Sequence, residues 1–167
     1  MGRTTRSRAI VVAAVFLAVL FLASGAAVWF VDWHSEAVPS SVADAEFDQI
    51  RSRFAGQPAL LDMATRQVDR SRTAPPSPVP LHTFHTVILD TRGGNRLVHM
   101  AVPYWLARRY ARHGGEFRWL GELTFLDDTE FDPEAIRLAF SEVQRQGPGV
   151  LVDYRHPSGG QFIAWVD

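Results

Sequence analysis

The chain has 167 residues, of which 47% are hydrophobic and 11% aromatic, and its formal net charge is −1. This length suits one ordinary domain, and this composition excludes a wholly disordered chain and a protein that binds nucleic acid over its whole surface. The sequence contains no cysteine, and all 17 of its basic residues are arginine. It therefore excludes a disulfide scaffold, a thiolate zinc site, a cysteine nucleophile and a catalytic lysine.

The clearest pattern in the chain runs from Ala9 to Val31, where 23 residues carry no charged side chain. As a helix this segment is roughly 34 Å long, which exceeds the ~30 Å hydrocarbon core of a bilayer. Residues 1–8 contain three arginines and no acid, whereas the first basic residue after the segment is Arg51. The positive-inside rule therefore predicts one transmembrane helix, a signal anchor, with residues 1–8 in the cytoplasm and the remaining chain outside it.

A cleaved signal peptide is the alternative interpretation of the same segment, and cleavage would give a secreted protein. The small residues Gly25 and Ala27 suit a signal peptidase. However, the apolar run is longer than the usual hydrophobic region of about 7–15 residues and continues past both positions. The sequence therefore favours a protein anchored in the cytoplasmic (inner) membrane, with the lipid bilayer as a partner of residues 9–31.

Residues 32–72 form the predicted juxtamembrane region. Ser40 or Ser41 can cap a helix that begins near Val42. One stripe of this helix is apolar, and we expect it to pack against the rest of the domain: Ala43, Phe47, Ile50 and Phe54. A short apolar run at residues 59–63 then predicts a strand.

Residues 73–80 (TAPPSPVP) form a predicted Pro-rich linker, because four prolines favour an extended backbone. Residues 81–167 form the predicted globular domain of the α+β class. Its expected elements are strands at 81–90 and 96–102, a helix at 103–112, a strand at 116–126, a helix that Asp132 caps and Gly147 ends, and a terminal hairpin of 150–155 with 161–166. This order predicts a small, mostly antiparallel sheet with two or three helices.

Histidines of the first predicted hairpin are candidates for metal binding or acid–base catalysis. Residues three apart on a strand point to opposite faces, so His82 and His85 cannot bind one metal ion. His85 and His99 could face each other across the hairpin, with Asp90 near the turn. A third ligand would have to come from elsewhere in the chain, and His156 and Asp153 are candidates for it. Because none of these residues has the spacing of a metal site, we expect structural histidines, no metal and no cofactor.

Four acidic residues, Asp127, Asp128, Glu130 and Asp132, crowd one short segment. Alternating acids are typical of a calcium loop, which needs glycine at its sixth position and glutamate at its twelfth. Counted from Asp128, these positions hold proline and alanine. We therefore expect a solvated loop that leads into a helix.

The predicted helix at 103–112 carries the candidate binding site. At 100° per residue, Arg108, Arg109 and Arg112 lie within about 100° of one another, and Trp105 falls on the same arc. Such a patch can bind a phosphate, a carboxylate or a lipid head group. A charged outer face whose arginine stems cover the tryptophan ring is the alternative.

No catalytic motif accompanies these candidates. The sequence contains no glycine-rich phosphate loop and no serine-hydrolase elbow. We therefore expect a membrane-anchored extracytoplasmic domain without catalytic residues, which binds or assembles with an envelope protein and not with nucleic acid. The alternatives are a metal-dependent or His/Asp-based enzyme module and a sensor of anions or lipid head groups.

Four segments share a pattern with other proteins: Arg53–Gln57 with Leu60-Leu61, Val102–Leu106, Gly147–Arg155 and Gly160–Trp165. Together they resemble an uncharacterised family of bacterial proteins with one N-terminal membrane helix. The resemblance implies membrane anchoring and carries over no catalytic residue.

Overall fold

The computed structural model of the chain describes residues 32–65, 67–69, 77–111, 131 and 138–167. Residues 32–167 belong to one compact unit. The predicted transmembrane helix at 9–31 and the predicted strand at 116–126 lie outside the described residues, as do residues 73–76 of the Pro-rich linker. Within the described ranges, no helix is long and apolar enough to cross a bilayer.

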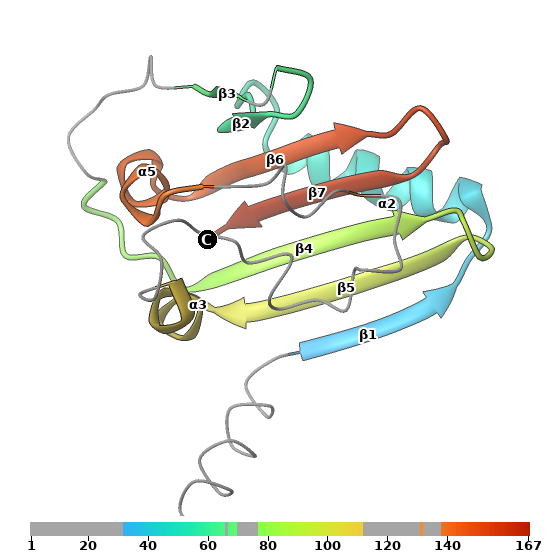
Figure 1. Cartoon of the computed structure of the whole chain (residues 1–167), viewed down its shortest axis with the longest axis horizontal. Coiled ribbons are helices and arrows are strands. Elements are labelled where there is room, and N and C mark those ends of the chain that lie inside the picture. The colour runs from blue at the N-terminus through green and yellow to red at the C-terminus, as the bar shows by residue number, and fades with distance from the viewer. Residues whose placement is uncertain (1–31, 66, 70–76, 112–130, 132–137) are drawn as a thin grey trace, which may run out of the picture. The chain divides into compact units, whose positions relative to one another are not determined.

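Seven strands of the described residues form one sheet, in the spatial order β1-β5-β4-β7-β6-β2-β3 (Figure 1). The strands are β1 (Asp32–Ala37), β2 (Leu61–Asp62), β3 (Gln67–Val68), β4 (Thr83–Asp90), β5 (Arg96–Pro103), β6 (Gly149–Arg155) and β7 (Gln161–Val166). Neighbouring strands run antiparallel, except that β2 runs parallel to β6. Together with three described helices, this sheet confirms the α+β class and its mostly antiparallel character.

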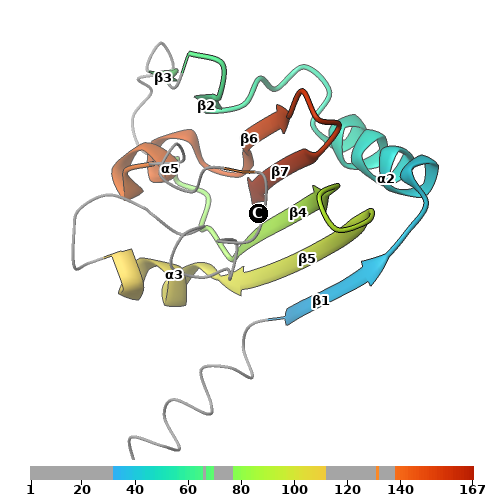
Figure 2. The same ribbon diagram turned by 45° about the vertical axis from the view of Figure 1, so that its right-hand side comes forward.

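The helices are α2 (Ser40–Arg53), α3 (Tyr104–Ala111) and α5 (Phe140–Gln146). Helix α2 lies across one face of the sheet, whereas α3 and α5 lie at the opposite end of the strands (Figures 1 and 2).

Helix α2 confirms the predicted apolar stripe. Ala43, Phe47 and Ile50 are buried and share one cluster with residues of four strands: Val87, Leu89, Leu97, Val150 and Ile163. Phe54, just past the helix, packs against the edge of this cluster. The predicted serine cap is wrong, because the helix begins at Ser40 after Pro39 and has no side-chain cap hydrogen bond.

Strand alternation buries both faces of the central strands. In β4, Val87 and Leu89 face α2, whereas Phe84, Thr86 and Ile88 face the other side, and all five are buried. Phe131 packs on that other side, with its ring centroid 5.9 Å from that of Phe162. The sheet thus has a core on each side.

Of three further predicted boundaries, one is wrong, one lies outside the described residues and one is confirmed. Pro103 is the last residue of β5 and not the first residue of a helix. Helix α3 begins at the next residue, Tyr104, whose N–H donates to the carbonyl of His82 at 2.7 Å. The predicted cap Asp132 lies outside the described residues, and the described helix α5 begins at Phe140. Its predicted end at Gly147 is confirmed, as is the terminal hairpin of β6 and β7.

Strand β1 was not predicted. It pairs antiparallel with β5 over Asp32–Ala37, and all six of its residues are exposed. Its sequence, DWHSEA, lacks the apolar alternation by which half-buried strands are recognised. Backbone pairing to β5, rather than side-chain burial, therefore defines this strand.

Candidate functional site

Helix α3 presents three of the four predicted binding residues to solvent. Trp105, Arg108 and Arg109 are exposed, and Trp105 keeps 55% of its surface accessible. The other side of the helix is buried: Tyr104, Leu106 and Ala107. Because positions three and four apart share a helix face, the exposed three form one surface, the α3 surface. Arg112 lies outside the described residues.

Tyr104 fixes the α3 surface to the sheet. Its ring stacks on Phe84 of β4, with the ring centroids 5.3 Å apart. Burial raises the pKa of the Tyr104 phenol above its ordinary value, and the positive charge of Arg108 acts in the opposite direction. Arg108 therefore lies close enough to the buried phenol to influence it electrostatically. The exposed charges of α3 are thus carried by a helix whose buried side packs on the sheet, and their ability to bind an anion stays a prediction.

The predicted pairing of His85 with His99 does not occur. His85 stands opposite Ala101 in the β4–β5 register. Its Nε2 lies 3.0 Å from Oδ2 of Asp167, and its ring stacks on Trp165 with the centroids 4.9 Å apart. His85 therefore forms a pair with Asp167 at the end of the sheet. The sequence analysis did not predict this partner.

His99 has a separate set of neighbours. Its ring stacks on His34 of β1, with the centroids 4.6 Å apart, and its Nε2 lies 3.5 Å from a carboxylate oxygen of Glu46 on α2. Asp90 occupies the opposite face of β4 by strand alternation. Its buried carboxylate accepts hydrogen bonds from the N–H of Arg92 at 3.1 Å and from the guanidinium of Arg96 at 3.4 Å.

The two proposed third ligands are also engaged elsewhere. The Nδ1 of His156 lies 2.7 Å from the hydroxyl of Ser158 within the β6–β7 turn. The carboxylate of Asp153 accepts hydrogen bonds from Arg51. Across the described part of the chain, no group of three His, Asp or Glu side chains is arranged to hold a metal ion. The acidic segment with Asp127, Asp128, Glu130 and Asp132 lies outside the described residues.

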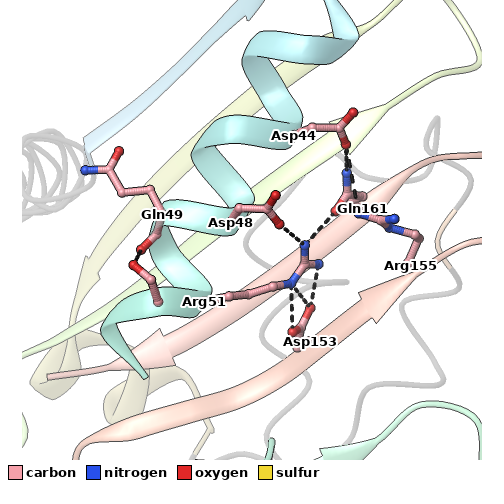
Figure 3. A network of polar contacts seen from close by, with 8 residues as sticks. Asp44, Asp48, Gln49, Arg51, Asp153, Arg155 and Gln161 are labelled. Carbon is pink, nitrogen blue, oxygen red and sulfur yellow. Dashed lines mark hydrogen bonds and ion pairs between the residues drawn. The ribbon is translucent and has the colours of Figure 1, made fainter. Parts of the chain in front are cut away.

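Arg51 is the centre of a polar network that the sequence analysis missed (Figure 3). Its Nη2 donates to Oδ1 of Asp153 at 2.8 Å, and its Nη1 donates to Oε1 of Gln161 at 3.0 Å. The hydrogen bond with Asp153 raises the pKa of Arg51, against a smaller opposite effect of burial. The guanidinium also lies 5.5 Å from the centre of the Phe47 ring. Arg51 therefore stays charged and joins α2 to the terminal hairpin.

Gln161 completes this network from within the sheet. Only 1% of its surface is exposed, so its amide needs partners inside the protein. Its Nε2 donates to Asp44 at 2.6 Å, and its Oε1 accepts a second hydrogen bond from Arg155 at 3.1 Å. Asp48 could be paired with Arg51 from helical spacing alone. The contacts of Arg51 with Asp153 and Gln161 could not be predicted in this way, because only the tertiary fold brings these residues together.

A hollow of about 440 Å³ lies beside the β4–β5 turn. It is lined by residues 35–39, from the end of β1 and the connection to α2, and by residues 93–96 of the turn. Gly94 adopts a φ of 104°, which the turn requires and which L residues with a side chain rarely adopt. The hollow is open to solvent at the exposed edge of the sheet.

The geometry thus defines an α+β domain with an exposed tryptophan–arginine surface on α3. At the other side, β1 forms an edge of the sheet that no second described strand pairs with, and a hollow lies beside it. Comparisons of this chain with protein-family models, with curated proteins and with solved structures find no match. The resemblance to membrane-anchored bacterial proteins therefore stays a prediction.

Proposed function

We propose that this chain is a single-pass protein of the cytoplasmic membrane that binds an envelope protein without catalysing a reaction. Residues 9–31 form the anchor, residues 1–8 stay in the cytoplasm, and residues 32–167 lie outside it. The uncharged segment and the arginines before it support this topology. The exposed position of Trp105 beside Arg108 and Arg109 carries the binding proposal, since tryptophan and arginine are enriched at binding hot spots.

The engagement of the other polar groups supports a binding role rather than a catalytic one. Arg51 and Gln161 make hydrogen bonds that join α2 to the sheet. His99 and Asp90 contact Glu46 and Arg96, respectively, rather than each other. Trp105 places a large aromatic surface in solvent. An exposed aromatic residue with two arginines three and four positions further along the same helix suits a protein surface that is apolar at its centre and acidic at its rim.

Fractionation and protease accessibility test the topology. We expect the full chain in the membrane fraction, with a tag after residue 167 digested by protease added outside spheroplasts and a tag before residue 1 protected. A mature protein that begins after Gly25 or Ala27 would replace the anchor with a cleaved signal peptide. A chain found entirely in the cytosol would contradict both the membrane anchor and the cleaved signal peptide.

Site-specific photo-crosslinking in cells tests the binding surface. A photoreactive amino acid in place of Trp105, which is 55% exposed, should give one discrete cross-linked species. The same amino acid in place of Val42, which is 51% exposed, should not. With the photoreactive residue kept at 105, Arg108→Gln with Arg109→Gln should reduce that species severalfold. Equal cross-linking from positions 105 and 42 would contradict a specific α3 surface.

The two exposed arginines of α3 favour a second candidate, a sensor of anions or lipid head groups. The full chain in neutral detergent would then bind an added short-chain anionic phospholipid more tightly than a zwitterionic one. Salt should weaken this preference for the anionic lipid, and the triple variant Arg108→Gln, Arg109→Gln and Arg112→Gln should abolish it. The same affinity for both lipids would remove this candidate.

The contact of His85 with Asp167 favours a third candidate, a His/Asp-based enzyme. Such an enzyme requires a turnover that His85→Gln removes and His99→Gln leaves unchanged. Turnover that survives His85→Gln would exclude this pair as its acid–base group.

A further inference from the structure

The outer edge of β1 is available for strand pairing. Among the described strands, only β5 pairs with it. The N–H of Val38 donates to the carbonyl of Asn95 at 3.0 Å, just past the last pair of the β1–β5 ladder. Because backbone groups alternate along an antiparallel strand, residues 32, 34 and 36 point their N–H and C=O groups toward β5. The backbone groups of Trp33, Ser35 and Ala37 therefore point outward.

We propose that β1 pairs antiparallel with β1 of a second copy of this chain, about a two-fold axis at Ser35. The two sheets then join into one continuous sheet across the axis, as in an isologous dimer. In this register Ser35 stands opposite Ser35 of the second copy, and Trp33 stands opposite Ala37. All three outward-pointing residues of each copy exchange backbone hydrogen bonds with the other copy.

Shape complementarity supports a second copy as the occupant of this edge. Trp33 is 57% exposed at one end of β1. The small residue Ala37 lies at the other end, where it helps to line the hollow of about 440 Å³ beside the turn. Antiparallel pairing brings Trp33 of each copy to the hollow of the other. The strand thus carries both a projecting side chain and a recess, at positions that the two-fold axis exchanges.

The avoidance of like charges selects this register over its neighbours. Pairing about Ser35 places His34 opposite Glu36 of the second copy, twice per dimer. A shift of the axis to His34 places Asp32 opposite Glu36, and a shift to Glu36 places the two Glu36 carboxylates opposite each other. Like charges directly opposite on a sheet are destabilising. Only the axis at Ser35 avoids an opposed pair of carboxylates among these three.

Cysteine cross-linking of the full chain tests the register, and the absence of native cysteine makes each introduced thiol unique. At the axis, Ser35→Cys places two Cα atoms about 5.5 Å apart, within the usual disulfide range. Ala37→Cys is the control, because its two copies are four residues apart along the strands, roughly 13 Å. We expect mild oxidation of membranes containing the chain to give a disulfide dimer for Ser35→Cys and a monomer for Ala37→Cys.

A second variant tests the side-chain contact. Trp33→Ala in the Ser35→Cys chain should lower the rate of dimer formation at least about tenfold, since a buried tryptophan anchor is typically worth more than a tenfold change in affinity. Val42→Ala in the same chain should leave the rate unchanged. No dimer for Ser35→Cys, or equal dimer for Ser35→Cys and Ala37→Cys, would overturn the proposal. The second of these results would indicate association through the N-terminal segment without a fixed strand register.

Discussion

Arg51 and Asp153 are 102 residues apart in the sequence, yet Nη2 of the arginine lies 2.8 Å from Oδ1 of the aspartate. The Nε of Arg51 also lies 3.0 Å from Oδ2, so the carboxylate is held by two donors of the same guanidinium. This bidentate geometry is the strongest form of the arginine–carboxylate contact. It joins α2 to the last hairpin of the domain.

The first prediction is that this pair contributes measurable coupling. Both side chains are about one-third exposed or less, so solvent screens part of the interaction. In a double-mutant cycle of Arg51→Met with Asp153→Asn, we expect a coupling free energy of about 1 kcal/mol. Chemical denaturation measures it. Arg53→Met on the same helix is the control, because Arg53 is exposed and should change stability by less than about 0.5 kcal/mol. Coupling near zero would reduce the pair to a surface contact.

The second prediction concerns the integration of α2 into the domain. Phe47 is fully buried in the cluster between α2 and the sheet. Phe47→Ala should therefore lower the free energy of unfolding by about 3–5 kcal/mol through lost burial and an unfilled cavity. Val42→Ala, on the exposed side of the helix, should cost less than about 0.5 kcal/mol. A small effect of Phe47→Ala would mean that α2 is not part of the cooperative unit.

Periodicity predicted the elements whose side chains are buried. The stripe of α2, the strand pair β4 and β5 and the hairpin of β6 and β7 all follow patterns of apolar residues. Strand β1 was not predicted, because its residues are exposed and it is defined by backbone pairing with β5. Short strands such as β2, which contributes two residues, depend on tertiary pairing rather than on local preference.

Helical spacing placed Trp105, Arg108 and Arg109 on one exposed face, because contacts within one helix follow from the sequence alone. The same reasoning failed for the histidines. Strand alternation allowed His85 to meet His99, but the nearest partners came from β7 and β1, which sequence spacing cannot bring to them. Interactions between distant elements thus decided where these side chains lie.

The third prediction concerns Gly147, which ends α5. Its φ of 74° and ψ of −161° lie in a region open essentially to glycine. A Cβ atom there would lie 2.5 Å from Oγ of Ser77, whose N–H donates to the carbonyl of Gln144. Gly147→Ala should therefore cost about 1–3 kcal/mol in unfolding free energy. Adding Ser77→Gly to the Gly147→Ala chain should recover only the part of this cost that comes from the steric clash.

Gly93 provides the matched control for this substitution. A Cβ atom at Gly93 would meet nothing within 4 Å, and its φ is not in the positive range. Gly93→Ala should change stability by less than about 0.5 kcal/mol. Equal effects of the two glycine substitutions would contradict the proposed backbone and steric origin.

The fourth prediction concerns the effect of pH on stability through Asp62, the last residue of β2 before the following turn. The N–H of Ala64 and the hydroxyl of Thr65 donate to its carboxylate at 2.8 and 2.9 Å. These hydrogen bonds, that of Ala64 first, lower the pKa of Asp62 below its ordinary value of 3.8. Because the folded-state pKa is lowered, the carboxylate stabilises the fold above the ordinary pKa. This contribution is lost as pH falls through the lower pKa of the folded state.

NMR titration of the Asp62 carboxyl carbon measures this effect directly. Thr65→Val should raise the pKa of Asp62 toward 3.8, because it removes one donor to the charged form and leaves the N–H of Ala64 in place. Ser52→Ala is the control, since that hydroxyl donates to the carbonyl of Gln49 and should leave the Asp62 titration unchanged. Asp62→Asn should make stability less sensitive to pH in this acidic range. An Asp62 pKa at or above 3.8 in the unmodified chain would contradict the hydrogen-bonded turn.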